Sequence, residues 1–406
     1  MSYTFIGGSV TAAKGFTASG IHCGIRKNKT KRDLALIFCE KKCTAAAVYT
    51  TNLVQSSPIT ITKKNLQDGY AQAVIVNSGN ANTCNADGDV KAEQMCSLIA
   101  KELSISPEDV IVASTGVIGQ VLPIEPIADA AGELAQLLSK DGATDAAEAI
   151  LTTDTVKKEV AVEIMIQDKP VRIGGISKGS GMIHPNMATM LCFVTTDAAI
   201  SSAMLQKAVR QAADVSFNMI SIDGDTSTND TLSVMASGLA GNDEITAEGE
   251  DYDLFVEGLT AVCRELARKM AKDGEGATKL LTCQVSGAKT EQDAKGVAKS
   301  VICSSLLKAA MFGADANWGR VLCAIGYSGC DVNVHKVDVS FASVKGCIDV
   351  CRSGAGIDFS EEEAKEILLE DEIEILITLH DGNASAEAYG CDLTYEYVKI
   401  NGDYRT

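Results

Sequence analysis

One hydroxyl side chain stands alone in the apolar, sulfur-rich stretch GMIHPNMATMLCF, which runs from Gly181 to Phe193. It belongs to Thr189, between Ala188 and Met190, and the glycine-rich sequence SKGSG leads into the stretch. A threonine in a protein core would account for this pattern. A nucleophile presented by a glycine-rich turn would account for it as well, because an activated hydroxyl can form a covalent intermediate. The stretch alone leaves both interpretations open.

Two glycine-containing turns could supply backbone N–H groups to an anion or an oxyanion. One is Ser114–Gly116, which contains Thr115, and the other is SKGSG at 177–181. Glycine lets the backbone approach a ligand closely, although most glycine-containing turns bind no ligand. A further candidate is Glu275, which stands between two glycines after a charged helical stretch. It is either a solvated helix end or a carboxylate that holds a substrate ammonium.

Two familiar motifs are present only in part. Residues 175–179 match G-x-S-x-G, but the following GSGMIHPN contains two glycines and a proline and cannot begin the helix that a nucleophile elbow requires. Ser177 is therefore not predicted to be a hydrolase nucleophile. Residues 223–229 alternate oxygen-bearing side chains as a calcium loop does, but Thr228 and Val234 replace the required Gly and Glu. A polar loop that positions small groups near a site remains possible.

These residues must be positioned by strands and helices. Apolar runs at 71–77 and 109–119 end in polar glycine-containing loops, which is typical of strands in layered proteins. Residues 158–166 and 170–176 alternate as a hairpin whose second strand runs into SKGSG. The patterns also predict two strands around a Lys41-Lys42 turn within 34–49, and helices at 88–104 and 251–272. Together they predict mixed sheets covered by helices.

Size, charge and cysteine content narrow the class of protein. A chain of 406 residues favours two domains, and a net charge of −18 without a basic run argues against binding to nucleic acid or to an anionic membrane. No apolar stretch reaches a membrane-spanning length, and the N-terminus does not resemble a signal peptide, so we expect a cytoplasmic protein. Most of the fourteen cysteines lie in apolar context and no C-x2-C pair occurs, so no metal site is predicted.

Taken together and in order, several motifs are far more specific than any one of them. They are TAAKGF at 11–16, VNSGNAN at 76–82, ASTGVIG at 113–119, LTTDT at 151–155, KGSGMIHPNMATML at 178–191, FNMISIDGDTSTND at 217–230, GADANWGR at 313–320 and YVKINGDYRT at 397–406. Through them the chain resembles, end to end, the ornithine acetyltransferase (glutamate N-acetyltransferase) family of arginine biosynthesis. Two positions depart from the family pattern, at Val156-Lys157 and at Ala316, where the family has proline. Neither touches a proposed reacting atom.

The resemblance implies an α+β fold, a layered αββα-type sandwich shared with self-cleaving aminopeptidases. It also implies self-cleavage between Ala188 and Thr189, which would give an α chain of residues 1–188 and a β chain of residues 189–406. Residues 280–406 are expected to form a C-terminal α/β subdomain. Two α and two β chains are expected to assemble, and no cofactor or metal is expected.

The resemblance further implies that Thr189 moves acetyl from N2-acetylornithine to glutamate by a ping-pong mechanism. The new α-amine of Thr189 would be its base, since a free α-amine titrates near neutral pH. Thr115 and Gly116 are expected to stabilise the oxyanion. Substrate contacts are implied at Thr152, Lys178, Thr189, Glu275, Asn401 and Thr406. Whether acetyl-CoA is also a donor stays open.

Two other functions remain as alternatives. A self-cleaving amidohydrolase or aminopeptidase could use the same scaffold, because an acyl-threonine needs only water as acceptor. An unprocessed relative that binds a small molecule without catalysis is the third interpretation.

Overall fold

The structure, a computed structural model, describes residues 2–184 and 190–402 of the chain. The chain divides into two compact units and passes between them more than once. The first unit comprises the described residues up to 179, together with 190–218 and 226–266; the second comprises 180–184, 219–225 and the residues from 267 onwards. Within the described ranges, no helix has both the length and the apolar character that crossing a membrane would require.

The first unit is built on one mixed sheet. Its strands are β1 (Tyr3–Ile6), β2 (Phe16–Ile21), β3 (Leu34–Tyr49), β4 (Tyr70–Asn80), β5 (Val110–Val117), β6 (Lys158–Ile166), β7 (Lys169–Lys178), β8 (Leu191–Thr196) and β10 (Thr231–Ala236). Their order is β1-β6-β7-β8-β10-β3-β4-β5, and β2 pairs with β3 outside this path. The pairs β8–β10 and β4–β5 are parallel, whereas the hairpin β6–β7 and its neighbours are antiparallel.

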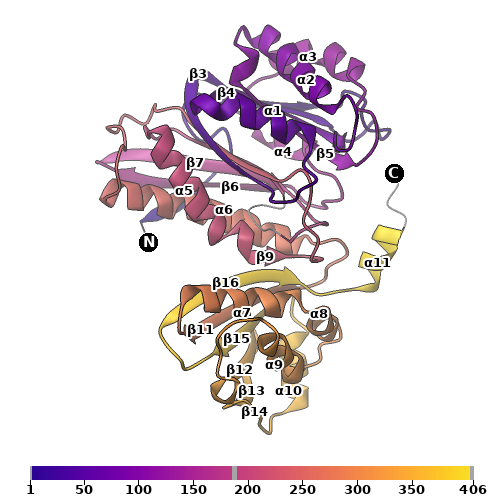
Figure 1. Cartoon of the computed structure of the whole chain (residues 1–406), viewed down its shortest axis with the longest axis vertical. Helices are drawn as coiled ribbons and strands as arrows, with labels where there is room; N and C mark the ends of the chain where they lie inside the picture. The colour runs from indigo at the N-terminus through magenta and orange to yellow at the C-terminus, as the bar shows by residue number, and fades with distance from the viewer. Residues whose placement is uncertain (1, 185–189, 403–406) are drawn as a thin grey trace. The chain divides into compact units, whose positions relative to one another are not determined.

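Alternating apolar residues give this sheet two buried faces. Leu34 and Leu36 of β3 pack into one core with α2 and α3, while Ala35 and Ile37 pack into another with the alanines of α4. Because side chains alternate along a strand, both sets are buried only when helices cover both faces. Figure 1 shows α1, α2 and α3 gathered beside β4 and β5. The helices are α1 (Ser57–Asn65), α2 (Gly88–Leu103), α3 (Glu125–Gln136), α4 (Ala143–Ala149), α5 (Ser202–Asp214) and α6 (Glu250–Lys272), of which α6 ends in the second unit.

The second unit has its own mixed sheet, in the order β14-β13-β12-β15-β11-β16-β9. Every second residue of β15, at positions 373, 375 and 377, packs into one core together with apolar residues of α7, α9 and α10. Figure 1 shows these helices beside the sheet. The strands are β9 (Ile220–Ser221), β11 (Leu280–Ala288), β12 (Asp338–Ser343), β13 (Gly346–Arg352), β14 (Ala355–Gly356), β15 (Glu372–Thr378) and β16 (Ala384–Cys391). The helices are α7 (Glu291–Cys303), α8 (Ser305–Phe312), α9 (Trp318–Gly326), α10 (Glu361–Leu368) and α11 (Tyr395–Gly402).

The predicted α+β class, with helices layered on mixed sheets, is confirmed. The hairpin at 158–176 is also confirmed, with Gln167 and Asp168 at positive φ in its turn. The prediction of two strands around Lys41-Lys42 is wrong, because β3 is one strand with a register irregularity between Phe38 and Cys43. Its first half pairs with β2 and β4 and its last residues pair with β10, so different partners keep both halves extended.

The core of the second unit can be tested at β15. Ile375→Ala removes a side chain that is fully buried in that core and should destabilise the unit by about 2–5 kcal/mol. The measurement is urea unfolding followed by the fluorescence of Trp318, which packs against the same core and is the only tryptophan in the sequence. Glu374→Ala, on the exposed side of the same strand, should change stability by less than about 0.5 kcal/mol. Equal changes in the free energy of unfolding for the two variants would contradict this account of the core.

Candidate active site

The end of β5 has a backbone geometry that only glycine allows. Gly116 adopts a φ of +135°, and a Cβ placed on it would lie 2.4 Å from the carbonyl carbon of Gly79. The β4–β5 register shifts at this point, where Asn80 faces both Thr115 and Val117. Glycine is required because two strands approach backbone to backbone. The predicted oxyanion donors, Thr115 and Gly116, therefore lie at a bulged strand end rather than in a regular ladder.

Lys178, the last residue of β7, reaches this strand end. Its Nζ lies 3.4 Å from the hydroxyl oxygen of Thr115, and both residues are at most 8% exposed. The ammonium donates to the hydroxyl oxygen, which leaves the hydroxyl proton available for another acceptor. A donor that itself accepts a hydrogen bond from a cation is polarised in this way. The structure thus brings together two residues, 63 positions apart, that the resemblance had assigned to different roles.

Asp154 is a buried carboxylate that holds the neighbouring segments. It accepts hydrogen bonds from the Lys158 ammonium at 2.6 Å, from the Gly179 N–H at 2.7 Å and from the Thr152 N–H at 3.0 Å. Burial alone would raise the pKa of the Asp154 carboxyl, but the ammonium groups of Lys158 and Lys178 and the Gly179 N–H outweigh burial and hold that pKa well below its usual range. The carboxylate is therefore charged. It fixes the position of Thr152, which is a predicted substrate contact.

The head of β8 lies directly beside these residues. Leu191 faces Lys178 across the β7–β8 pairing, and the Met190 carbonyl accepts the N–H of Thr231 at 2.8 Å. Met190 is the residue that follows the predicted nucleophile. Thr189 itself and Ala188, which form the predicted cleavage site, lie outside the described residues, as does Thr406.

The second unit contains the other predicted substrate residues. The Asn401 amide donates to a carboxylate oxygen of Glu275 at 2.7 Å, and the Glu275 N–H donates to the Ser180 carbonyl at 2.8 Å. Gly181 lies against this carboxylate so closely that a Cβ on it would stand 2.4 Å from the Glu275 carboxyl carbon. Within the part of the chain that the structure describes, no salt bridge reaches Glu275, although the residue is only 8% exposed. Glu275 is thus not a solvated helix end.

The partial motifs do not form sites of their own. Ser177 lies within β7, fully buried, and its hydroxyl has no hydrogen-bond partner among the described residues, so it is not presented on a strand-to-helix turn. Side chains of the loop that resembles a calcium site are used in hydrogen bonds within the protein. Asp223 accepts the N–H groups of Met182 and Ile183. In the described ranges, no group of three His, Cys, Asp or Glu residues is placed to hold a metal ion.

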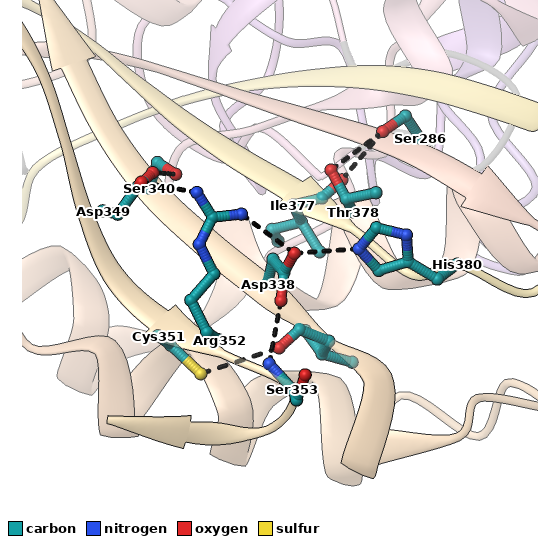
Figure 2. Close-up of polar contacts among 11 residues, drawn as sticks. Ser286, Asp338, Ser340, Asp349, Cys351, Arg352, Ser353, Ile377, Thr378 and His380 are labelled. Atoms are coloured by element: carbon teal, nitrogen blue, oxygen red, sulfur yellow. Dashed lines mark hydrogen bonds and ion pairs between the residues drawn. The ribbon is translucent and has the colours of Figure 1, made fainter. Parts of the chain in front are cut away.

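An aspartate–histidine pair in the second unit could suggest a catalytic triad. Asp338 accepts a hydrogen bond from His380 at 2.8 Å, and Arg352 and the Ser353 N–H also bind this carboxylate (Figure 2). The nearby Ser286 hydroxyl donates to the Thr378 hydroxyl oxygen and to the Ile377 carbonyl (Figure 2). His380 is half exposed, which together with these bonds marks a surface ion-pair network rather than an activated nucleophile.

Comparison with known proteins identifies the family. The chain matches the model of the ArgJ family over residues 17–406. It is 49% identical over 400 residues to the arginine biosynthesis bifunctional protein ArgJ of Caldanaerobacter subterraneus subsp. tengcongensis, covering 98% of this chain and 99% of that protein. The protein of the same name from Symbiobacterium thermophilum is 49% identical over 404 residues, covering 99% of this chain and all of that protein.

A solved structure gives the same assignment. The crystal structure of the arginine biosynthesis bifunctional protein argJ from Bacillus halodurans is 49% identical, covers 52% of this chain and 98% of its own chain, and superposes with a TM-score of 0.50. The family model spans nearly the whole sequence, and the relatives are 49% identical over almost their full length. Both findings support the same assignment. The chain belongs to the ArgJ family, whose members named here are bifunctional proteins of arginine biosynthesis.

Proposed function

We propose that this chain is an autoprocessed N-terminal-threonine acetyltransferase that moves acetyl from N2-acetylornithine to glutamate in the cytoplasm. The observation that carries the proposal is the Thr115–Lys178 pair beside the head of β8. Met190, the residue that follows the predicted nucleophile in the sequence, immediately precedes β8, and the first residue of β8, Leu191, pairs with Lys178. The relatives are named as bifunctional proteins of arginine biosynthesis, which supports amino-acid substrates of this kind.

The first reaction is cleavage of the chain itself. The Thr189 hydroxyl attacks the Ala188 carbonyl, the C–N bond breaks, and its nitrogen takes the proton to become a free α-amine. Water then hydrolyses the ester between the two residues, leaving a carboxylate on Ala188 and a free hydroxyl on Thr189. The products are an α chain of residues 1–188 and a β chain of residues 189–406, assembled as two of each. The solved relative supports such a cut, because its chain corresponds to about half of this one.

Acetyl transfer then uses the new amine as the base. It takes the Thr189 hydroxyl proton while the oxygen attacks the acetyl carbonyl of acetylornithine, and the proton passes to the leaving ornithine nitrogen. Glutamate attacks the acetyl ester through its amine, and the threonine hydroxyl is restored. The Thr115 hydroxyl, polarised by Lys178, and the Gly116 N–H would stabilise the oxyanion in both halves of the reaction.

Charge explains the substrate contacts. Both amino acids carry an α-carboxylate, for which Lys178 supplies a cation. Only ornithine carries a side-chain ammonium, for which Glu275 supplies a buried carboxylate that no salt bridge among the described residues satisfies. Thr152, Asn401 and Thr406 would complete the contacts. The word "bifunctional" in the relatives' names supports a second donor, for which we propose acetyl-CoA.

Transfer and hydrolysis differ in their dependence on glutamate. With acetylornithine as donor, release of ornithine at steady state should require glutamate and produce acetylglutamate in equal amount, because water does not accept the acetyl group. The two products are measured by chromatography with and without glutamate, and acetyl-CoA is tested as the donor in a parallel reaction. Ornithine release that is indifferent to glutamate would favour the amidohydrolase alternative.

Self-cleavage is tested at Thr189. Thr189→Ala should give one folded, inactive species near 42.6 kDa by mass spectrometry, whereas the native chain should give two fragments. Thr189→Ser, which keeps a hydroxyl, should still be cut. A cut product from Thr189→Ala would move the nucleophile to another residue. A native chain that stays whole after prolonged incubation would support the non-catalytic alternative.

The role of Glu275 is tested by separating the two half-reactions. Glu275→Gln keeps the shape and the Asn401 contact but removes the charge, so ornithine release should slow about 10- to 100-fold, as expected for loss of a charged hydrogen bond. Attack by glutamate on the acetyl-enzyme should change by less than about 3-fold. Glu387→Gln, at another acidic residue of the same unit, is the control. If ornithine release is unchanged in Glu275→Gln, Glu275 does not bind the ammonium.

A further inference from the structure

The polar loop that ends at Thr231 is held firmly in the first unit. The Thr50 hydroxyl donates to the Ser227 carbonyl at 2.8 Å, and the Asn52 amide donates to the Thr226 carbonyl at 2.9 Å. Backbone N–H groups of Thr50 and Ser56 bond to the carbonyls of residues 230 and 228. These four bonds come from one segment, residues 50–56, and do not involve the side chain of Asn229. That side chain therefore projects from a loop that is fixed independently.

Asn229 directs its side chain to the end of β5. Its Nδ2 donates to the Ser114 carbonyl at 2.7 Å and to the Ala81 carbonyl at 2.6 Å. Its Oδ1 accepts from the hydroxyls of Thr83 at 2.8 Å and Thr228 at 2.6 Å. Asn229 is 7% exposed, so these four bonds are made away from water, where losing them is costly.

The Ser114 carbonyl belongs to the peptide unit that leads into Thr115. The β4–β5 ladder pairs Ser78 with Thr115 and Gly79 with Gly116 and then shifts register at Asn80, so regular strand pairing ends beside these residues. We propose that Asn229 is a positioning residue, which orients the peptide of Ser114 and thereby aims Thr115 and Gly116 at the reacting acetyl group. The inference rests on the proposed acetyl transfer for its effect on rate. It explains the polar loop that resembled a calcium site.

The same strand offers a matched control. The amide of Asn65 donates to the Val110 carbonyl at 2.8 Å and to the Pro107 carbonyl at 3.2 Å, and Asn65 is 9% exposed. Asn65 thus makes equivalent bonds at the start of β5, whereas Asn229 makes them at its end. A purely structural role predicts the same consequences for both side chains. A positioning role predicts that, for the same loss of stability, a substitution at Asn229 lowers kcat and a substitution at Asn65 does not.

The experiment compares Asn229→Asp with Asn65→Asp in the full chain. Each variant replaces an amide donor by a carboxyl of the same shape. In Asn229→Asp, kcat should fall about 10- to 100-fold for both half-reactions, with KM for acetylornithine within about 2-fold, because an oxyanion donor acts only in the transition state. In Asn65→Asp, the melting temperature should fall while kcat stays within about 3-fold. If Asn229→Asp does not fold, Thr83→Val takes its place in the comparison. This variant removes one hydrogen bond to the Asn229 side chain and should lower kcat by a smaller factor.

Amide hydrogen exchange makes the test independent of activity. Exchange at Thr115–Val117 should accelerate at least about 10-fold in Asn229→Asp and should be unchanged in Asn65→Asp. Unchanged exchange in Asn229→Asp, or equal losses of kcat in both asparagine variants, would overturn the inference. Faster exchange with normal kcat would also overturn it. A native enzyme without acetyl transfer would instead refute the proposed function, while the exchange comparison would still decide whether Asn229 holds the strand end.

Discussion

The first unit of this protein depends on one buried carboxylate. Asp154 binds the Lys158 ammonium at 2.6 Å and the backbone N–H groups of Thr152 and Gly179, and it stays charged because these partners outweigh the cost of burial. Removing one member of such a pair leaves an uncompensated charge, at a cost of about 3–5 kcal/mol. The carboxylate thereby fixes the start of β6, the end of β7 and the segment that carries Thr152. Lys178, the residue before Gly179, is held at the distance that lets it reach Thr115.

Close backbone contacts set the remaining geometry within each unit. Gly116 allows β5 to approach the backbone of Gly79, and Gly181 lies where any side chain would meet the carboxylate of Glu275. Hydrogen bonds then fix these approaches, through Asn229 at the Ser114 carbonyl and through Asn401 at Glu275. Glycine gives the space, and an asparagine or aspartate side chain sets the direction. The residues of the proposed site are thus held in place by hydrogen bonds from neighbouring side chains.

Some elements and contacts of this fold can be predicted from the sequence, and others cannot. Local patterns predict the β6–β7 hairpin, α2 and β5, because their signals lie within one segment. The long strand β3 is missed because its two halves are kept extended by different partners. Asp154 and Asn229 lie inside recognised motifs, yet their partners are up to 148 positions away, and no local pattern reports such contacts. Motif resemblance names the residues of a site, whereas the bonds that orient them require the fold.

The sheet of the first unit also explains how a cleaved chain would keep its shape. β8 is a fully buried strand that pairs with β7 on one side and with β10 on the other. β10 pairs in turn with β3, so the two strands that follow the proposed cut lie between strands that precede it in one sheet. A break ahead of Met190 removes none of these pairings, and separating the two products would require breaking β7–β8 and β10–β3. The proposed cut would therefore free an α-amine one residue ahead of Met190, and β8, which follows, would stay anchored on both sides by the sheet rather than by the peptide bond that was lost.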